Sequence, residues 1–502
     1  MTLTGVNIYG DIISWGDQGN GRYVNPILNA DYSDPDVIRV DDKYYMVCSD
    51  FHFIGMPVLE SSDMVNWEII SQVYDKFDYP GWNEFKHYAG GSWAPAIRYH
   101  NGLYYVYFCT PDEGLFMSTA SDPHGPWSEL HLVKDVKKWE DPCPFWDEDG
   151  QAYLVRSQYG AGPIYLHKMS ADGKELLDDG TIIYEGEVAE GPKMHKFNGK
   201  YYISLPEGGV RGGWQTALRS DSIYGPYERK VVLETGSTDI NGPHQGSIVD
   251  TNDGKWWFYH FQEVPKLGRV VHLQPMEWVN GWPKMGVDYD GNGVGEPVME
   301  WDMPVAGHNE TKPQSSDSFD DGKLGLQWQA NHLWIPENIS FNKKEGWISI
   351  TAATADSLKN APNTLTQKMT GYTGVATVKM DFSDMNEGQV AGLGCLAKVY
   401  RGLGVAKKDG RNLLYFEEGG KRREICPISG NQVYLKADLD ANNNSHTLSY
   451  SLDGKEYHTA CEPFEMIWGN WKGPRIGIYS YTSNEDSGAG TVHFDDFEYI
   501  YE

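Results

Sequence analysis

The sequence predicts an all-β protein in which a five-bladed β-propeller is followed by a β-sandwich. One segment recurs five times within the first 260 or so residues. The repeat stops after Trp301, while alternating strand patterns continue to the end of the chain. No stretch has sustained helical periodicity, and turn-forming residues punctuate the chain at strand spacing. At 502 residues the chain is too long for one core and fits two domains.

Each copy of the repeat ends in a turn followed by an aromatic residue in an apolar run, which is typical of a hairpin entering a strand. Successive copies lie about 50 to 60 residues apart, the length that a four-stranded blade needs. The innermost strand of every blade runs along the central channel, so equivalent residues converge there. The five copies are at 41–45, 101–105, 149–153, 198–202 and 253–257.

A chemically different residue lies eleven or twelve positions before the last residue of each copy. Proline follows Asp34 and Asp141 directly, which holds the chain extended and presents both carboxylates toward the axis. A single Asp before Pro is usually a turn residue, but acids at three equivalent positions indicate a shared site. The five positions are Asp34, Ala94 beside Trp93, Asp141, Glu190 and Gln245 beside His244.

Two carboxylates acting across one bond are typical of glycoside hydrolysis, and a third nearby would raise the pKa of the acid and keep it protonated near neutral pH. The formal net charge of -29 excludes nucleic acid and anionic membranes as favoured partners. No apolar run predicts membrane insertion. The 13% aromatic content suits a neutral sugar as well as blade cores.

The motifs around Asp34, Asp141 and Glu190, in this order, resemble glycoside hydrolase family 43 over about residues 25–301. The resemblance implies a five-bladed propeller and an inverting, often exo-acting enzyme, such as an α-L-arabinofuranosidase or a β-D-xylosidase. It assigns Asp34 as the general base that activates water and Glu190 as the general acid. Asp141 would tune and orient the acid. Inversion predicts base and acid carboxyls roughly 6.5 to 9.5 Å apart.

The resemblance also implies substrate-binding residues. Trp93 and Ala94 match a motif beside the terminal sugar, and Arg269 matches an arginine that hydrogen-bonds that sugar. Phe51, His52 and Trp214 are predicted from position alone, as pocket walls or as packing residues.

His244 matches a histidine at the channel centre that lines the substrate region and often contacts a calcium ion whose other ligands are mostly water. Calcium prefers oxygen ligands, so one histidine is a poor site by itself. The resemblance therefore implies a structural Ca²⁺ in the channel and no cofactor that takes part in the chemistry.

We divide the chain into a catalytic propeller over 1–306, a linker over 307–316 and an accessory β-sandwich over 317–502. The last segment resembles the concanavalin-like C-terminal domain of β-xylosidase-type members of the family. In those members a loop of this domain closes the pocket and favours removal of single sugars. The alternative is an appendage that only stabilises the propeller. Trp468 and Trp471 are the candidate contacts with the pocket.

The sequence thus predicts an exo-acting enzyme that releases terminal α-L-arabinofuranose from side chains of arabinoxylan or xyloglucan, or from their oligosaccharides. A β-D-xylosidase or a dual-specificity enzyme is the alternative. A non-catalytic carbohydrate-binding protein would have lost at least one acid. We expect plant cell-wall saccharides as partners and export to the periplasm or outside the cell, the signal being absent from this chain, with a cytoplasmic location as the alternative. Oligomeric state is left open.

Overall fold

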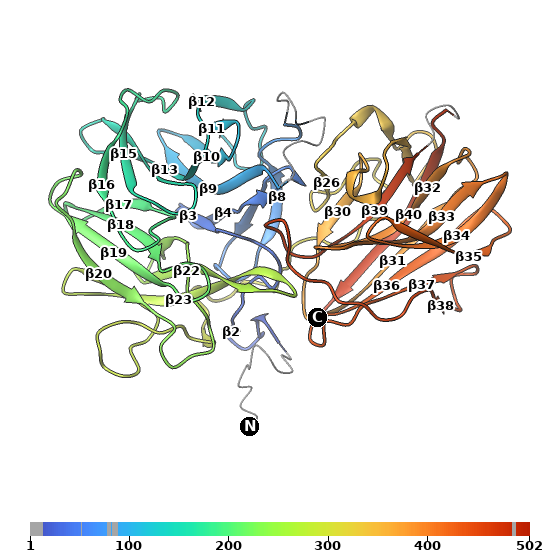
Figure 1. Cartoon of the computed structure of the whole chain (residues 1–502). Helices are drawn as coiled ribbons and strands as arrows, with labels where there is room; N and C mark the ends of the chain where they lie inside the picture. The colour runs from blue at the N-terminus through green and yellow to red at the C-terminus, as the bar shows by residue number, and fades with distance from the viewer. Residues whose placement is uncertain (1–13, 52, 78–81, 83–88, 484–487) are drawn as a thin grey trace.

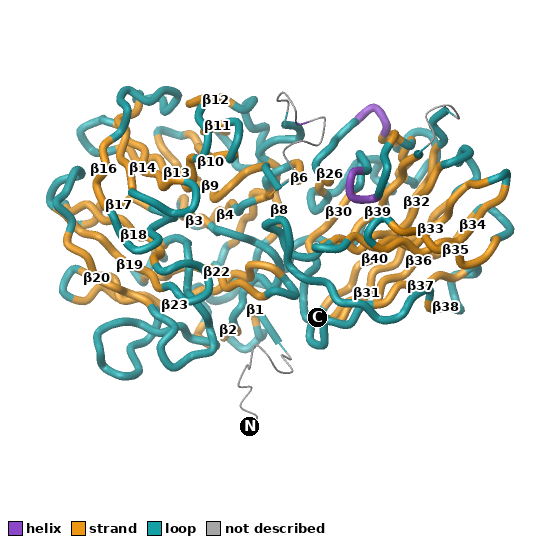
Figure 2. Tube along the Cα trace, viewed as in Figure 1, coloured by secondary structure: helices purple, strands orange, loops and turns teal. Residues whose placement is uncertain are grey.

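The computed structural model describes residues 14–51, 53–77, 82, 89–483 and 488–502, which form two β-rich bodies side by side (Figure 1). Strands dominate both bodies, and the described residues add two short 3-10 turns, Pro336–Asn338 and Leu358–Asn360 (Figure 2). The all-β prediction is confirmed. A search of the described residues finds no helix with the length and apolar character needed to cross a membrane.

The first body contains five successive antiparallel sheets, the blades of the propeller; four of them have four strands, and the second has a fifth strand. The innermost strands β3, β9, β13 and β17 approach one another in order, and β21 closes the ring against β3. The blades are β3 (Asp36–Val40), β4 (Lys43–Val47), β7 (Pro57–Ser61), β8 (Glu68–Gln72); β9 (Gly91–His100), β10 (Leu103–Thr110), β11 (Gly114–Ala120), β12 (His131–Asp135); β13 (Trp139–Trp146), β14 (Ala152–Gln158), β15 (Ile164–Met169), β16 (Thr181–Tyr184); β17 (Lys193–Phe197), β18 (Lys200–Glu207), β19 (Trp214–Ser220), β20 (Glu228–Leu233); and β21 (Ile248–Asp250), β22 (Trp256–Val264), β23 (Gly268–Val279), β24 (Trp282–Met285).

The repeated turns join the innermost strand of each blade to the second strand, as the sequence predicts. Asn101 and Gly102, for example, both have positive φ, which suits the tight hairpin between β9 and β10. Two further elements flank the blades. β5 (Asp50–Phe51) extends the second blade beyond β9, and β1 (Gly16–Asp17), β2 (Arg22–Val24) and β25 (Glu300–Asp302) form a small separate sheet.

Buried charges tie the innermost strands together. Asp36 of β3 accepts hydrogen bonds from Arg98 of β9 at 2.6 Å and from Ser247 at 2.7 Å, and Lys193 of β17 lies 3.7 Å away. Burial alone would raise the pKa of Asp36, but the charges of Arg98 and Lys193 outweigh it and lower the pKa. The ring that presents the site residues is therefore fixed by charge as well as by apolar packing.

The second body is a sandwich of two sheets around a continuous apolar core. One sheet contains β27 (Ile339–Ser340), β28 (Ile348–Thr351), β40 (Thr491–Tyr501), β31 (Thr373–Asp381), β36 (Gln432–Asp440), β37 (Thr447–Ser451) and β38 (His458–Thr459). The other contains β35 (Lys421–Pro427), β34 (Arg411–Glu418), β33 (Tyr400–Lys408), β32 (Gln389–Leu396), β39 (Arg475–Thr482), β30 (Leu365–Lys368), β26 (Gln329–Asn331) and β6 (Phe53–Ile54), with β29 (Ala353–Thr354) beside β39.

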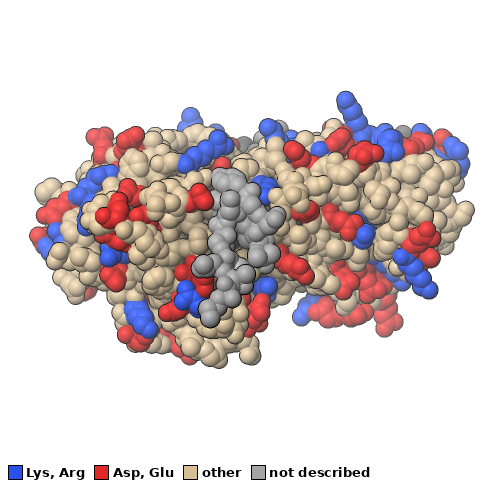
Figure 3. All heavy atoms as spheres, turned by 90° about the horizontal axis from the view of Figure 1, so that it is seen from below, with Lys and Arg blue, Asp and Glu red and all other residues tan. Residues whose placement is uncertain are grey.

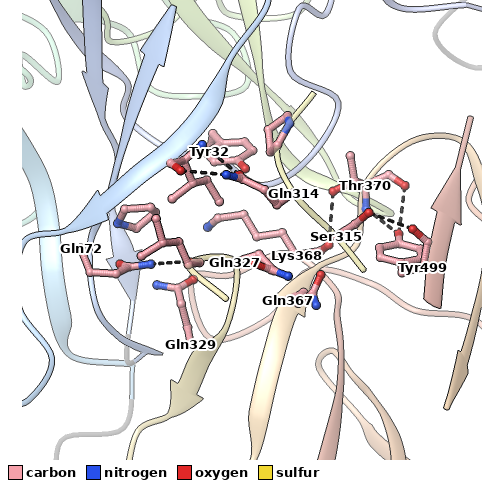
Figure 4. Close-up of a pocket in the computed structure, with 14 residues that line it drawn as sticks. Tyr32, Gln72, Gln314, Ser315, Gln327, Gln329, Gln367, Lys368, Thr370 and Tyr499 are labelled. Atoms are coloured by element: carbon pink, nitrogen blue, oxygen red, sulfur yellow. Dashed lines mark hydrogen bonds between the residues drawn. The ribbon is translucent and has the colours of Figure 1, made fainter. Parts of the chain in front are cut away.

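The two bodies share structure at their junction. Strand β6 belongs to the first blade by sequence, yet it pairs with β26 in the sandwich. The segment predicted as a linker packs on the first blade, because the Gln314 amide exchanges two hydrogen bonds with the backbone of Ile69. A small polar cavity of about 20 Å³ lies here, lined by Gln72, Gln314, Gln327, Gln329 and Gln367 among others (Figure 4). It has room for about one water molecule.

Charged side chains cover the outer surface. On the face seen in Figure 3, acidic and basic side chains are interspersed over the propeller, and acidic ones gather along one edge of the sandwich. The excess of negative charge predicted to repel polyanions therefore lies partly on exposed surface.

Candidate active site

A cavity of about 310 Å³ lies at the end of the propeller channel, next to the sandwich. Fourteen residues line it, and all but one of them come from the propeller. Of the residues predicted from sequence to lie at the pocket, eight line this cavity: Asp34, Phe51, Trp93, Ala94, Asp141, Glu190, Arg269 and Trp471. The others are Glu140, Tyr159, Gly160, Gly209, Val210 and Gln245.

A recurring backbone conformation presents one residue from each blade. Positive φ angles between 39° and 57° occur at Asp34, Ala94, Asp141, Gly191 and Gln245. Such angles are rare for residues other than glycine and concentrate at functional sites. They also correct the count made from sequence, because Gly191, rather than Glu190, is the equivalent of Asp34. Glu190 precedes this position by one residue, as Glu140 does in the third blade.

Asp34 is buried between a cation and a hydroxyl. The guanidinium Nη1 of Arg269 lies 3.3 Å from its Oδ1, and the Ser49 hydroxyl donates to its Oδ2 at 2.6 Å. Burial raises the pKa of Asp34, opposed by Arg269 and Ser49. The same Ser49 Oγ lies 2.6 Å from the backbone nitrogen of Ala94, so it connects two of the equivalent positions.

Asp141 accepts hydrogen bonds from the Ser157 hydroxyl at 2.5 Å and from the Gly191 N–H at 2.8 Å. The amide of Gln245 is 3.4 Å from its other oxygen. Burial and the charge of Glu190 raise the pKa of Asp141 to about 6. Because Gly191 follows Glu190 directly, Asp141 holds the backbone that carries Glu190.

Glu190 pairs with His244, whose Nε2 lies 2.7 Å from Oε1. Burial would raise the pKa of Glu190, but the hydrogen bond and charge of His244 outweigh it and lower the pKa. We expected like-charge repulsion to raise the pKa of this residue. The structure instead gives the raised values to Asp141 and Glu140, because they lack a basic partner.

Arg269 is almost fully buried among aromatic rings. Its guanidinium lies over Phe261 at 4.7 Å and over Trp468 at 5.1 Å, and the latter belongs to the sandwich. These contacts leave one edge of the guanidinium on Asp34. The position is consistent with the predicted hydrogen bond to a bound sugar.

Aromatic side chains form one wall of the cavity. The ring of Trp93 lies 5.4 Å from Phe51, 6.0 Å from Tyr159 and 5.9 Å from Trp471. Trp471 and its neighbour Asn470 both have positive φ at the tip of a two-residue turn between Gly469 and Lys472. This conformation is unusual for a bulky residue, and it presents a half-exposed indole to the cavity.

Two residues predicted to bind the substrate, Trp214 and His244, lie within the described part of the chain but are not among those that line the cavity. The Trp214 indole donates to the carboxylate of Glu207 at 3.3 Å instead, because Glu207 gathers several donors at that end of β18 and β19. The prediction that Trp214 walls the pocket is therefore wrong. His52 lies outside the described residues.

Sequence reasoning missed Glu140, Tyr159 and Gly160 as pocket residues. Glu140 stands directly before Asp141, and the motif around Asp141 gives it no role of its own. Its position one residue before the positive-φ point is the signal that it shares with Glu190. Tyr159 and Gly160 follow β14 and carry no motif.

His244 does not stand within a set of protein oxygen ligands. Its Nε2 is hydrogen-bonded to the carboxyl of Glu190, and its buried Nδ1 has no hydrogen-bond partner among the described residues. Within the described ranges no three His, Cys, Asp or Glu side chains are grouped to hold a metal ion. Since calcium binds through oxygen, these side chains alone do not make a calcium site. The Ca²⁺ expectation stays a prediction, and no step below depends on it.

Comparisons with known proteins agree with this geometry. The family model described as "Glycosyl hydrolases family 43" matches residues 23–283. A second, "Beta xylosidase C-terminal Concanavalin A-like domain", matches residues 316–500. A solved family 43 protein of Bacillus licheniformis is similar to the chain with a TM-score of 0.84 and 26% identity, over 95% of this chain and 99% of that one.

Three curated relatives span nearly the whole chain. A "Putative beta-xylosidase" of Xylanibacter ruminicola is 56% identical over 93% of this chain and 88% of its own length. A "Beta-xylosidase" of Formosa agariphila is 35% identical, with 97% and 92% covered. A "Non-reducing end alpha-L-arabinofuranosidase" of Bacteroides ovatus is 26% identical, with 95% and 94% covered.

Proposed function

Because the chain belongs to glycoside hydrolase family 43, we propose that it is an exo-acting, inverting β-D-xylosidase that acts on plant cell-wall oligosaccharides. The two more similar relatives described above are named β-xylosidases, whereas the relative named an arabinofuranosidase is only 26% identical. These relationships favour the alternative given by the sequence over its main reading. An α-L-arabinofuranosidase, alone or combined with xylosidase activity, is the second candidate.

The observation that carries the proposal is the cavity itself. Its volume of about 310 Å³ is at the small end of ligand pockets, which span about 300–1,000 Å³. Carboxyls line it from the propeller, while Trp471 of the sandwich lines it beside Trp93. A small pocket with a wall of this kind suits one terminal sugar better than the middle of a polysaccharide chain.

In the proposed mechanism Asp34 is the general base. Its carboxylate takes a proton from water as the water oxygen attacks the anomeric carbon from one face of the sugar. Glu190 gives its proton to the departing oxygen on the other face, so hydrolysis inverts the anomeric configuration. Asp141 positions Glu190 through the N–H of Gly191.

The pairing of Glu190 with His244 has a role in this cycle. The imidazole nitrogen at 2.7 Å stabilises the carboxylate that remains after the proton has left. Arg269 keeps Asp34 oriented and offers its other N–H groups to hydroxyls of the bound sugar. Phe51 and Trp93 supply the apolar wall for the sugar ring.

The direct test compares p-nitrophenyl β-D-xylopyranoside with p-nitrophenyl α-L-arabinofuranoside, using Asp34→Ala as the inactive control. We expect the xyloside to be hydrolysed with the higher kcat/KM. Preference for the arabinofuranoside would transfer the proposal to the second candidate. Hydrolysis of neither glycoside, with sugar binding intact, would support a non-catalytic carbohydrate-binding protein.

Location and partner follow from this substrate class. A polysaccharide-degrading enzyme meets its substrate outside the cytoplasm, so export to the periplasm or the cell exterior is part of the proposal. Fractionation of the native host with an antibody against the protein would test it. If the antibody detects the protein only in the cytoplasmic fraction, imported oligosaccharides would be favoured as the substrates.

A further inference from the structure

Four carboxyl side chains line the one cavity: Asp34, Glu140, Asp141 and Glu190. Arg269 is the only Lys or Arg among the lining residues. Like charges in a partly buried cavity cannot all ionise near neutral pH, so at least one of these groups retains a proton.

Three of the four have partners that stabilise the ionised form. Arg269 lies against Asp34, His244 against Glu190, and the Ser157 hydroxyl and Gly191 N–H donate to Asp141. These contacts make Asp34, Asp141 and Glu190 less favourable places for the retained proton than a buried carboxyl without a cation or hydroxyl partner.

Glu140 has neither a cation nor a hydroxyl as partner, and only the backbone N–H of Gly160 favours its carboxylate. It is largely buried, and within the described ranges its carboxyl forms neither an ion pair nor a side-chain hydrogen bond. The nearby cation of β14, Arg156, is held between the rings of Trp139 and Tyr165, at 3.6 and 4.1 Å. Among the described residues it forms no ion pair with Glu140.

The groups that face Glu140 are mostly acidic. They are Asp141 on its own strand, Glu190 and Asp34 across the cavity, the buried Cys109 thiol of β10 and the backbone N–H of Gly160. Only Gly160 favours the carboxylate.

We propose that Glu140 holds the retained proton and shares it with Asp141 and Glu190, so that it acts through Glu190 to keep the general acid protonated. This inference rests on the proposed function, because it concerns the acid of the same site. Burial and the charges of Asp141 and Glu190 raise the pKa of Glu140 to about 8, against about 6 for Asp141. Because the other three carboxyls each have a cation, imidazole or hydroxyl partner and Glu140 has none, the last proton of the cluster rests on Glu140.

The proton balance is simple. The O–H bond of Glu140 breaks as its proton passes through pocket water to the Glu190 carboxylate, which becomes the acid. Glu190 then gives this proton to the departing sugar oxygen, while Asp34 takes one from the attacking water. Glu140 regains a proton from solvent and Asp34 returns its own, so that each turnover consumes one water molecule.

The test is the pH dependence of kcat/KM for Glu140→Gln, measured on xylobiose or on another unactivated glycoside that the wild type cleaves. We expect kcat/KM to fall as the pH rises, with a midpoint near pH 8 in the wild type and near pH 6 in the variant, following the two pKa values. At pH 7.5 this shift lowers kcat/KM by about 20-fold, while at pH 5.5 the two proteins differ by less than about twofold. Glu129→Gln, an exposed glutamate of the second blade, should match the wild type at both pH values.

If kcat/KM of Glu140→Gln falls at the same pH as that of the wild type, the inference is overturned. A second measurement does not need turnover: the infrared band of protonated carboxyl should be present in the wild type at pH 7, disappear near pH 8 and be weaker in Glu140→Gln. If no such band titrates in the wild type, the inference fails even where the variant does not fold. A wild type that cleaves no glycoside but shows the band contradicts the proposed function alone.

Discussion

The propeller and the sandwich contribute to the pocket in different ways. The propeller supplies all four carboxyls and Arg269, most of them at or beside the positive-φ points of successive blades. The sandwich supplies one lining residue, Trp471, at the tip of a strained turn. The ring of blades thus carries the charged groups of the pocket, whereas the sandwich shapes one of its walls.

Two buried carboxylates hold these regions together. Asp31 of the propeller accepts hydrogen bonds from the N–H of Arg269 at 2.9 Å and from the N–H of Gly473, in the sandwich, at 2.7 Å. One side chain thus fixes both the strand that carries Arg269 and the turn that carries Trp471. Asp50, beside the pocket residue Phe51, is paired with Lys368 of the sandwich at 3.3 Å.

Removing the general base in the propeller should have the largest effect on activity. Asp34→Asn should lower kcat/KM by about 10²–10⁴-fold on activated and unactivated xylosides alike, because water must be activated whatever group leaves. Steady-state kinetics on an aryl xyloside and on xylobiose measures it, with the exposed Asp42→Asn as the control. A large loss on one substrate only would contradict the base assignment.

Removing the general acid should slow hydrolysis of unactivated substrates far more than that of activated ones. Glu190→Ala should lower kcat by about 10²–10⁴-fold on xylobiose, whose leaving oxygen needs a proton. The loss on an activated aryl xyloside should be far smaller, because nitrophenolate departs without assistance. Equal losses on the two substrates would count against Glu190 as the acid.

The junction can be weakened without touching the chemistry. Lys368→Met leaves Asp50 buried without its partner, which should cost about 3–5 kcal/mol in the free energy of unfolding. Urea denaturation measures it, and adding Asp50→Asn should recover most of the loss. If the double variant is as unstable as Lys368→Met, the ion pair is not what the junction depends on.

Substitution of the sandwich residue that lines the pocket should have the smallest effect. Trp471→Ala removes an aromatic contact worth about 0.5–1.5 kcal/mol, so KM should rise by about 2–10-fold with little change in kcat or stability. The exposed Tyr289→Ala serves as the control. A fall in kcat as large as that of Asp34→Asn would show that the sandwich takes part in the chemistry.

The sequence predicted the propeller better than the contacts between the propeller and the sandwich. The five repeats led to the propeller and to Asp34, Asp141 and Glu190, because equivalent positions of a repeat must converge. Counting residues misplaced Glu190 by one position, since only the backbone angle of Gly191 reveals the register. The chemical meaning of Glu140 depends on which charges surround it, and no motif records that.

The sequence named Trp468 and Trp471 as candidate contacts with the pocket, but it did not indicate which residues they would meet there. Trp471 meets Trp93 only because the sandwich docks where it does, through pairs such as Gly473 with Asp31. Trp214 was misassigned for the same kind of reason, because the carboxylate of Glu207 determines where its indole lies. A side chain's partner across two domains has no signature in local sequence.

The most direct test of the account is the stereochemistry of hydrolysis, followed by proton NMR during the first minutes of xyloside cleavage. Inversion by Asp34 and Glu190 predicts that α-xylose appears first from a β-xyloside and then mutarotates toward the equilibrium mixture. Initial release of β-xylose would mean that a carboxylate attacks the sugar directly, and would contradict the roles assigned to these two residues.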